Sequence, residues 1–389
     1  MNQLTSGSTA AHLRLAAWYF MYFAFVGAYM PYFSLYLEAQ SLTPSRIALL
    51  MTLGQLMRLL TPVFWGWISD YSGRRTPIIR TSALLSMLIF TVYFFTVDFI
   101  SLVLVTALLH FFWCAALPLV EALTFAHLRD TNNSYGRVRV WGSIGFVVAV
   151  FGVGVWLNHQ PIASLLAITW LILGLMLLAA WRLKEVATPH FVQSGKPSPS
   201  LCQSRVIVLM VVGFLMSAAH GAFYVFYSIH LAANGYDSTA TGFLWSLGVI
   251  AEVLVFIYMP HIVDHQKLKR VLMLCLALAV LRFLIIGWCI EMVALVVVAQ
   301  ILHGATFGAH HVASVASLNQ WFLPGQQGRI QALYGSLSFG GGGLLGGLIA
   351  GQTWASLGPE ISFTISAGFA LLGLAATHFA FSATTAQSI

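Results

Sequence analysis

The strongest constraint on this chain is a series of long apolar segments separated by short polar ones. A helix needs about 20 mostly apolar residues to cross the hydrocarbon core of a bilayer. Because open strands cannot satisfy their backbone polar groups in lipid, each segment is predicted to be a helix. The sequence therefore predicts an all-α polytopic membrane protein. Its twelve predicted transmembrane helices lie at roughly 13–37, 46–69, 76–97, 99–127, 137–158, 161–183, 205–231, 240–262, 268–290, 292–318, 328–356 and 360–382.

The composition excludes several classes of protein. Only 7% of the residues are charged, against about 25% in soluble domains. This excludes a soluble enzyme, a disordered protein and a protein that binds nucleic acid through a charged surface. We find no nucleophile–base motif and no phosphate-binding loop, so no enzyme activity and no cofactor are predicted. No metal site is predicted either, because no CxxC pair and no metal-ligand spacing occurs among Cys114, Cys202, Cys275 and Cys289.

The distribution of Lys and Arg predicts the orientation in the membrane. With the N-terminus inside, the outer side carries Arg46 alone. Such a bias is typical of cytoplasmic loops, so both termini are predicted to be cytoplasmic. The basic residues on the inner side are Arg14, Arg74, Arg75, Arg80, Arg129, Arg137, Arg139, Arg182, Lys184, Lys196, Arg205, Lys267, Lys269, Arg270 and Arg329.

The chain divides into two similar halves. The only long polar stretch, 184–204, falls between the sixth and seventh segments and predicts a flexible cytoplasmic linker. Asp70 and Asp264 each stand before a basic cluster and are 194 residues apart, about half the chain. A duplicated six-helix unit explains this spacing, and internal repeats build many secondary transporters. We therefore expect one six-helix bundle at 1–183 and a second at 205–389.

The loop after the second segment, GWISDYSGRR, resembles the signature loop of the major facilitator superfamily. Gly73 would permit a tight turn, and Gly66 would let another helix approach closely. Asp70 opposes the dipole at a helix C-terminus and needs a partner, which Arg74, Arg75 or a neighbouring helix could supply. The resemblance implies a conformational latch. The alternative is a solvated turn whose charges only fix the topology.

Five charged residues lie inside the predicted spans: Arg58, Glu121, Arg139, Glu252 and Arg282. An ionisable group at mid-membrane costs at least about 2.5–3.5 kcal/mol on insertion scales, so each suggests a function. With both glutamates ionised, one positive charge is left over, which would favour a solute carrying one negative charge. The alternative is that these groups form ion pairs that only hold helices together.

Histidines are also frequent in the spans. His303, His310 and His311 share one helix face. A metal site there is not predicted, because no acidic or thiol ligand accompanies them. His303 is a candidate for proton or substrate binding, whereas His310 and His311 are better explained by packing. His220 and His230 could line a cavity.

Two stretches, PLVEALTF around Glu121 and YGRVRVWGSIGF around Arg139, are similar to the lactose permease branch of this superfamily. In that permease a glutamate and an arginine 18 residues apart hold the sugar, and Glu121 and Arg139 match them. Arg282 and His303 match its helix-nine arginine and helix-ten histidine. The resemblance implies proton coupling and substrate binding at these positions.

The chain departs from that pattern at three positions. Thr306 replaces the acid one turn after the histidine. The helix-eight acid is displaced by one turn, to Glu252. Phe146 replaces the tryptophan that stacks on the sugar. These changes argue against lactose and against sugars generally.

The stretches GFLWSLGVIAEVLVF, VRVWGSIGF and ILHG are more similar to those of the bacterial 3-phenylpropionate permease group. This resemblance implies proton-coupled symport of a small organic solute, preferably an aromatic monocarboxylate such as 3-phenylpropionate. The transport would run across the bacterial inner membrane by alternating access, with the proton gradient as the only energy source. A sugar or nucleoside symporter and a proton-antiport exporter remain alternatives.

The residues and the resemblance together predict one site. Arginine makes bidentate contacts to carboxylates, and a buried glutamate or a histidine can carry a proton near neutral pH. We expect a monomer in the bilayer, with a small solute and protons as its partners and no nucleic acid. The predicted substrate contacts are Glu121 paired with Arg139, and Arg282, Phe146 and Trp245; the predicted proton sites are Glu252 and His303.

Overall fold

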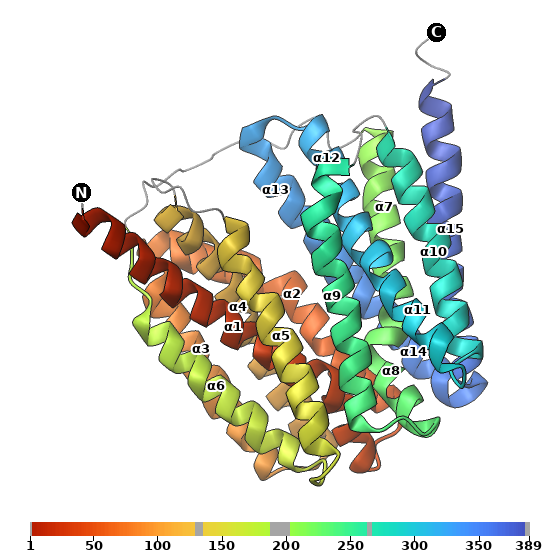
Figure 1. Cartoon of the computed structure of the whole chain (residues 1–389), viewed down its shortest axis with the longest axis horizontal. Helices are drawn as coiled ribbons and strands as arrows, with labels where there is room; N and C mark the ends of the chain where they lie inside the picture. The colour runs from red at the N-terminus through yellow and green to blue at the C-terminus, as the bar shows by residue number, and fades with distance from the viewer. Residues whose placement is uncertain (1, 129–134, 187–202, 263–266, 386–389) are drawn as a thin grey trace. The chain divides into compact units, whose positions relative to one another are not determined.

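A computed structural model describes residues 2–128, 135–186, 203–262 and 267–385 (Figure 1). Within these ranges the regular structure is entirely helical. Among the described residues, eleven helices are long and apolar enough to cross a membrane, or twelve if the pair Pro44–Thr61 and Val63–Ser72, bent by 42°, forms one span. The predicted all-α polytopic fold is confirmed. Most of the predicted linker, and Asp264, lie outside the described residues.

The helices follow the predicted segments closely, and several of the predicted spans are each built from more than one helix. In chain order they are α1 (Asn2–Ala39), α2 (Pro44–Ser72), α3 (Thr76–Phe90), η1 (Thr91–Phe94), α4 (Phe99–Leu128), α5 (Tyr135–Leu157), α6 (Ser164–Arg182), α7 (Ser204–Ala219), α8 (Gly221–Ala233), α9 (Ser238–Ile262), α10 (Leu268–Trp288), α11 (Val293–His303), η4 (Gly304–Ala309), α12 (His310–Trp321), α13 (Pro324–Gly335), η5 (Ser336–Gly342), α14 (Gly343–Leu357) and α15 (Pro359–Thr385).

The contacts divide the chain into two compact units, which differ from the predicted bundles in two segments. Residues 42–56 group with the second half of the chain, and residues 237–246 group with the first half. We call the units unit 1 (Met1–Ser41, Met57–Val192 and Asp237–Ser246) and unit 2 (Leu42–Leu56, Gln193–Tyr236 and Leu247–Ile389).

Segment 42–56 joins unit 2 because it packs closely against α14. The Ser45 hydroxyl donates to the Gly351 carbonyl at 3.1 Å. A Cβ atom on Gly347 would collide with the Thr52 side chain. Glycine at this position therefore lets the Thr52 side chain pack directly on the backbone of α14.

Segment 237–246 joins unit 1 for the same physical reason. A Cβ atom on Gly242 would lie 2.7 Å from the Val150 carbonyl oxygen of α5. From α1, the Tyr32 hydroxyl is 2.7 Å from that same carbonyl and 3.3 Å from the Ser238 carbonyl. Small residues and one shared hydroxyl thus hold the start of α9 against α1 and α5.

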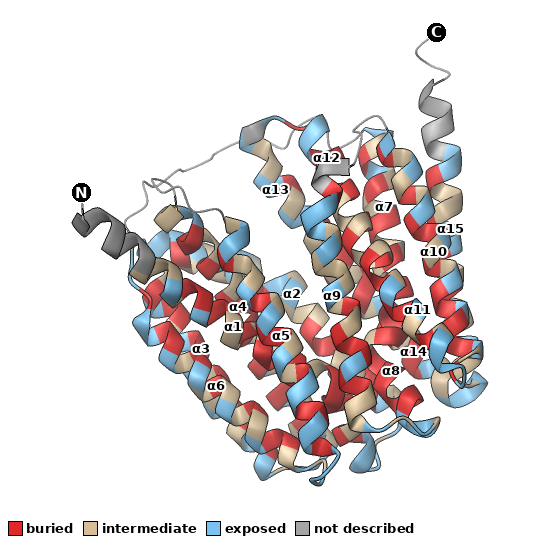
Figure 2. Ribbon diagram, viewed as in Figure 1, coloured by how far each residue is buried: buried red, intermediate tan, exposed pale blue. Residues whose placement is uncertain are grey.

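The interior of unit 1 is rich in aromatic residues from α1. Tyr22 stacks on Trp18 at 4.9 Å and on Trp113 of α4 at 4.4 Å between ring centroids. Gly145 of α5 packs directly on the Phe20 carbonyl of α1, with no room for a Cβ atom. Figure 2 shows α1 as largely buried within this unit. The aromatic core fixes α1 beside α4 and α5, which carry the polar residues described below.

Unit 2 contains helices that are interrupted within the predicted spans. The seventh predicted span breaks at His220, between α7 and α8. Two others contain π-helical turns, at Gly304–Ala309 and Ser336–Gly342. Gly304 lets α11 and η4 approach the Ala251 backbone of α9, where a Cβ atom would come within 2.8 Å. Such irregular turns often accompany functional sites, and the break at His220 and the first π turn both border the polar residues of unit 2.

Candidate functional site

Arg282 of α10 is fully buried in unit 2. Its Nε donates to the Ala299 carbonyl at 2.9 Å. Its Nη1 bonds to His220 Nε2 at 3.1 Å and donates to the Thr306 hydroxyl at 3.3 Å. Its Nη2 has no hydrogen-bond partner among the described residues. A buried cation held by these neutral acceptors is costly, and a bound anion would relieve that cost.

His220 lies at the break between α7 and α8. Its Nδ1 lies 2.8 Å from the Met216 carbonyl. A guanidinium group can only donate hydrogen bonds, so His220 Nε2 must accept from Arg282. The imidazole proton is then on Nδ1 and is donated to Met216. While the bond to Arg282 stands, His220 is neutral.

A second pair of titratable groups lies beside this contact. His303 Nε2 is 3.8 Å from Glu252 Oε2, with the side chains 7% and 20% exposed. The His303 ring is 5.8 Å from the His220 ring. Its Nδ1 has no partner among the described residues. Arg282, two imidazoles and one carboxyl group therefore lie in a single buried cluster, which we call the Arg282 cluster.

Aromatic rings surround the cation and His303. The guanidinium carbon of Arg282 is 4.4 Å from the centre of the Phe223 ring and 5.2 Å from that of Phe283. Phe223 and Phe307 both stack on His303, at 5.7 and 5.5 Å. Such contacts attract a cation to the ring faces. They also exclude water, which strengthens electrostatic interactions inside the cluster.

The two polar residues predicted to pair in unit 1 do not form an ion pair in the described structure. Glu121 of α4 accepts a hydrogen bond from the Tyr135 hydroxyl at 3.1 Å. The Arg139 guanidinium carbon lies 4.0 Å from the Phe23 ring centre and 5.8 Å from that of Tyr19. These contacts contradict the predicted direct pair of Glu121 and Arg139. Tyr135 lies one turn before Arg139 on α5 and donates its hydroxyl hydrogen bond to the Glu121 carboxylate. The Arg139 guanidinium group packs on the Phe23 ring of α1 instead.

Phe146 and Trp245 are also buried in unit 1, at 7% and 5% exposure. The Phe146 backbone packs on Gly27 of α1. Trp245 lies in segment 237–246. Unit 1 thus contains four of the predicted site residues, and the other three belong to unit 2: Arg282, Glu252 and His303.

Arg58, the fifth charge predicted inside the spans, is placed differently from the other four. Its side chain is exposed on α2.

Of the two glycines in the predicted latch loop, only Gly73 has the role that the sequence predicted, a tight turn. Gly73 has φ +63°, the left-handed region that suits glycine. A Cβ atom on Gly66 would meet no atom within 4 Å in the described structure. Gly66 therefore marks no close helix contact here, unlike the prediction.

The charges of this loop are arranged differently from the predicted pairing. Asp70 and Arg74 are exposed, and no ion pair within the described residues joins Asp70 to Arg74 or Arg75. Instead, Glu185 Oε2 accepts from the backbone N–H groups of Arg75 and Thr76, at 2.9 and 2.7 Å. A carboxylate at this position caps the start of α3. Glu185 thereby ties the chain after α6 to the loop.

The sequence missed four residues of this arrangement. His220 carried no role beyond a suggested cavity lining, and Tyr135 and Glu185 carried none. Thr306 was interpreted only as a lost acid, although its hydroxyl accepts from Arg282. A usable signal was present for Tyr135, which lies one helical turn before Arg139. Nothing in the local sequence marks His220 as the partner of a residue 62 positions away.

Comparisons with known proteins relate this chain to membrane transporters. The model of the MFS_1 like family matches residues 12–365. The chain is 30% identical over 361 residues to a probable 3-phenylpropionic acid transporter of Escherichia coli (strain K12), covering 90% of this chain and 93% of that protein. It is 21% identical over 273 residues to the nucleoside permease NupG of the same strain, covering 62% and 63% of the two chains. These relatives are transporters, not enzymes.

Solved structures show the same fold. The crystal structure of the nucleoside transporter NupG superposes with a TM-score of 0.82 at 16% identity. It covers 95% of this chain and 99% of that one. The human organic anion transporter MFSD10 superposes with a TM-score of 0.68 at 15% identity, over 95% and 99% of the chains. At these identities the likeness concerns the fold alone.

Proposed function

Because this chain belongs to the MFS_1 like family of the major facilitator superfamily, we propose that it is a proton-coupled symporter of a small organic anion. The preferred solute is an aromatic monocarboxylate such as 3-phenylpropionate, moved into the cell by alternating access. The relative that is 30% identical carries that solute in its name. The proposal extends this substrate class to the present chain on the basis of its own residues.

The observation that supports the proposal most directly is the buried, incompletely hydrogen-bonded guanidinium group of Arg282. Its guanidinium group is fully buried, and its Nη2 has no partner among the described residues. A carboxylate is the ligand that fits this donor, since it can accept two parallel N–H bonds. Phe223, 4.4 Å from the guanidinium carbon, offers a ring face beside the anion. An aromatic acid would therefore use both features at once.

The contact between Arg282 and His220 suggests how a proton enters the cycle. A carboxylate that accepts from Nη1 as well as Nη2 would displace His220 Nε2 from the guanidinium. The freed nitrogen could then bind a proton, which the Arg282 bond forbids. Glu252 and His303, at 3.8 Å from each other, are the adjoining proton sites. One anion moving with one proton is electroneutral, so a pH gradient alone would drive the transport.

A nucleoside is the second candidate solute, because several relatives are nucleoside transporters by name. In unit 1 the Glu121 carboxylate, with the Tyr135 hydroxyl bonded to it, could bind sugar hydroxyls. A proton-antiport exporter would use the same proton sites in the opposite direction. Glu121, Arg139, Phe146 and Trp245 are retained as proposed solute contacts of unit 1.

The proposed setting follows the predicted orientation. The protein would act as a monomer in the bacterial inner membrane, with both termini in the cytoplasm. The proton gradient would supply the energy, without a cofactor. The basic residues of the inner loops support this sidedness.

The test uses purified protein in liposomes that enclose a pH-sensitive dye. An inward proton gradient is imposed, and labelled 3-phenylpropionate, uridine, maltose and neutral 3-phenylpropanol are added in turn. We expect accumulation of the aromatic acid and acidification of the lumen above the level of protein-free liposomes. That control is necessary because the undissociated acid crosses lipid unaided.

Other outcomes point to other functions. Accumulation of uridine alone would reject the carboxylate and retain the symporter. Proton-driven loss of a preloaded solute, without uptake, would indicate an exporter. Accumulation that is equal with and without the proton gradient would reject proton coupling.

A further inference from the structure

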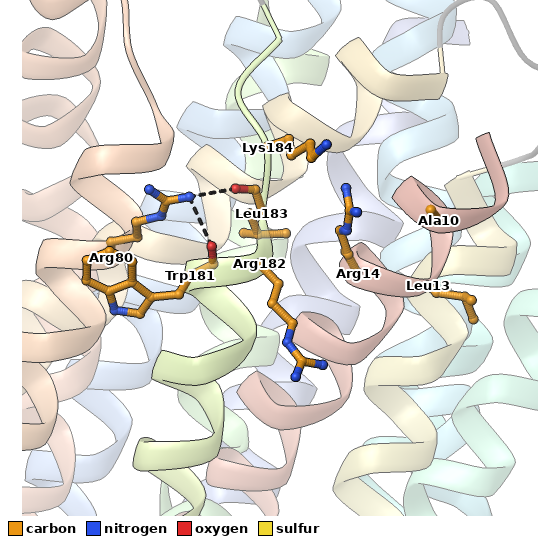
Figure 3. A pocket seen from close by; sticks show the side chains of 8 residues that line it. All are labelled: Ala10, Leu13, Arg14, Arg80, Trp181, Arg182, Leu183 and Lys184. Carbon is orange, nitrogen blue, oxygen red and sulfur yellow. Dashed lines mark hydrogen bonds between the residues drawn. The ribbon is translucent and has the colours of Figure 1, made fainter. Parts of the chain in front are cut away.

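Unit 1 contains a pocket at the end where α1 begins and α6 ends. Its volume is about 670 Å³. Figure 3 shows side chains from the start of α1, from α3 and from the end of α6 around it. Its lining residues are Ala10, Leu13, Arg14, Arg80, Trp181, Arg182, Leu183 and Lys184.

The pocket is strongly basic. Arg14, Arg80, Arg182 and Lys184 make up half of its lining, and no lining residue is acidic. The adjacent acid, Glu185, is committed to the first backbone N–H groups of α3. Like charges held together at the end of a helix bundle repel one another, and an anion between them would remove that repulsion.

Arg80 builds the frame of the pocket. Its Nη2 donates to the carbonyls of Trp181 and Leu183 at 3.0 and 2.9 Å (Figure 3). Its guanidinium carbon also lies 5.1 Å from the centre of the Trp181 ring. These bonds satisfy carbonyl groups that the end of α6 leaves open. They also fix the chain just before Lys184.

Two cations remain for a ligand. Figure 3 shows the Arg14 side chain extending from α1 toward the level of Lys184, whereas Arg182 points the other way along α6. Lys184 is exposed and Arg14 is half-buried. The two charges come from segments far apart in the sequence, so their meeting is produced by the fold.

Apolar side chains border the cations. Leu13 is 60% exposed and Trp181 is 58% exposed. Tryptophan beside basic residues is typical of the membrane–water interface, and basic pockets between helices on the cytoplasmic side suit acidic headgroups. We propose that this pocket binds the phosphate of an anionic phospholipid headgroup, with Arg14 and Lys184 as its contacts. A free phosphate would use the two cations but would leave Leu13 and Trp181 uncovered.

The test uses the full-length protein in detergent and measures retained lipid by native mass spectrometry. Phosphatidylglycerol is compared with zwitterionic phosphatidylcholine, for the wild type and for Arg14→Gln with Lys184→Gln. We expect roughly 25-fold weaker retention of phosphatidylglycerol in the double variant, since each cation near an acidic headgroup contributes a factor of about five. The matched control, Lys267→Gln with Arg270→Gln, removes the same charges from elsewhere and should retain the lipid.

Equal retention by the two double variants would overturn the site. Displacement of the lipid by glycerol 3-phosphate at equal concentration would overturn the lipid assignment in favour of a free anion. The charge-preserving exchange Arg14→Lys with Lys184→Arg guards against misfolding, because it should keep the preference for phosphatidylglycerol. If it loses that preference while its thermal unfolding is unchanged, the proposal fails. None of these readouts depends on which solute the protein transports.

Discussion

Arg282 donates a hydrogen bond of 3.1 Å to Nε2 of His220, and this bond fixes the protonation state of the imidazole. The imidazole proton is on Nδ1, where the Met216 carbonyl accepts it at 2.8 Å. Protonation of Nε2 and the bond from Arg282 are therefore mutually exclusive. A ligand that competes for Arg282 changes the proton affinity of His220, and protonation of His220 changes the affinity for that ligand equally.

Replacing Arg282 should weaken the binding of carboxylates selectively. In Arg282→Gln the affinity for 3-phenylpropionate should fall by about 10- to 100-fold, the usual value of hydrogen bonds to a charged group. Binding of neutral 3-phenylpropanol should change little. Ligand-induced shifts in thermal unfolding measure both, with the exposed Arg270→Gln as control. An equal loss for the acid and the alcohol would contradict a role in charge recognition.

Replacing His220 should separate solute binding from proton movement. Glutamine can still accept from Arg282 but cannot take up a proton, so His220→Gln should bind the acid within a few-fold of the wild type. The wild type should bind the anion more tightly as the pH falls, by up to about tenfold per unit for one linked proton. This dependence should flatten in the variant.

The control for that experiment is His230→Gln. His230 is 2% exposed and bonds to the Ile286 carbonyl at 3.1 Å, so it is equally buried in the same unit. It should keep the pH dependence of the wild type. If His220→Gln keeps it too, the proton does not bind at His220.

Neutralising Glu252 should stop accumulation but not exchange. Glu252→Gln loses a carboxyl group that lies 3.8 Å from His303, and an amide cannot carry a proton at this position. Uptake driven by a pH gradient should be abolished, while exchange of labelled for unlabelled solute continues. Glu360→Gln, at the start of α15, serves as the control. Gradient-driven accumulation at the wild-type level would exclude Glu252 from the proton path.

Two glycines of α5 should respond oppositely to alanine. A Cβ atom on Gly145 would collide with the Phe20 carbonyl of α1, whereas one on Gly152 would meet nothing within 4 Å. Gly145→Ala should destabilise the protein by about 1–3 kcal/mol through overpacking. Gly152→Ala should be neutral or stabilising by up to about 1 kcal/mol, because glycine weakens a helix. Equal unfolding temperatures for the two variants in detergent would refute the close α1–α5 contact.

The boundaries of the two units show where the prediction from sequence stopped. The repeat spacing of Asp70 and Asp264 predicted a division at the linker, whereas contacts assign 42–56 to unit 2 and 237–246 to unit 1. Connectivity decides which residues follow one another, but packing decides which residues touch. Glycines such as Gly347 and Gly242 permit those contacts. The local sequence around a glycine does not indicate which helix will pack against it.

The candidate site also shows which features the sequence predicted and which it did not. The sequence singled out Glu121, Arg139, Glu252, Arg282 and His303 because charges and histidines are costly inside a membrane. It could not assign their partners. Glu121 bonds to Tyr135, and Arg139 faces Phe23, although the resemblance to the lactose permease branch implied that the two charged residues pair. The rotation of α4 and α5 about their axes determines this, and α1 supplies the ring.

By itself, the sequence determined that this protein is a multi-span helical membrane protein of the transporter class. The spans follow from apolar composition over windows of about 20 residues, which acts whatever the neighbouring helix is. The transporter class follows from the resemblance of several motifs to a known family. Only the tertiary structure decided that His220 meets Arg282, 62 residues away, and that Arg14 and Lys184 line one pocket. A hydrogen bond or a shared pocket requires two side chains to arrive at one depth and on facing sides of different helices, and this depends on packing along the whole length of each helix.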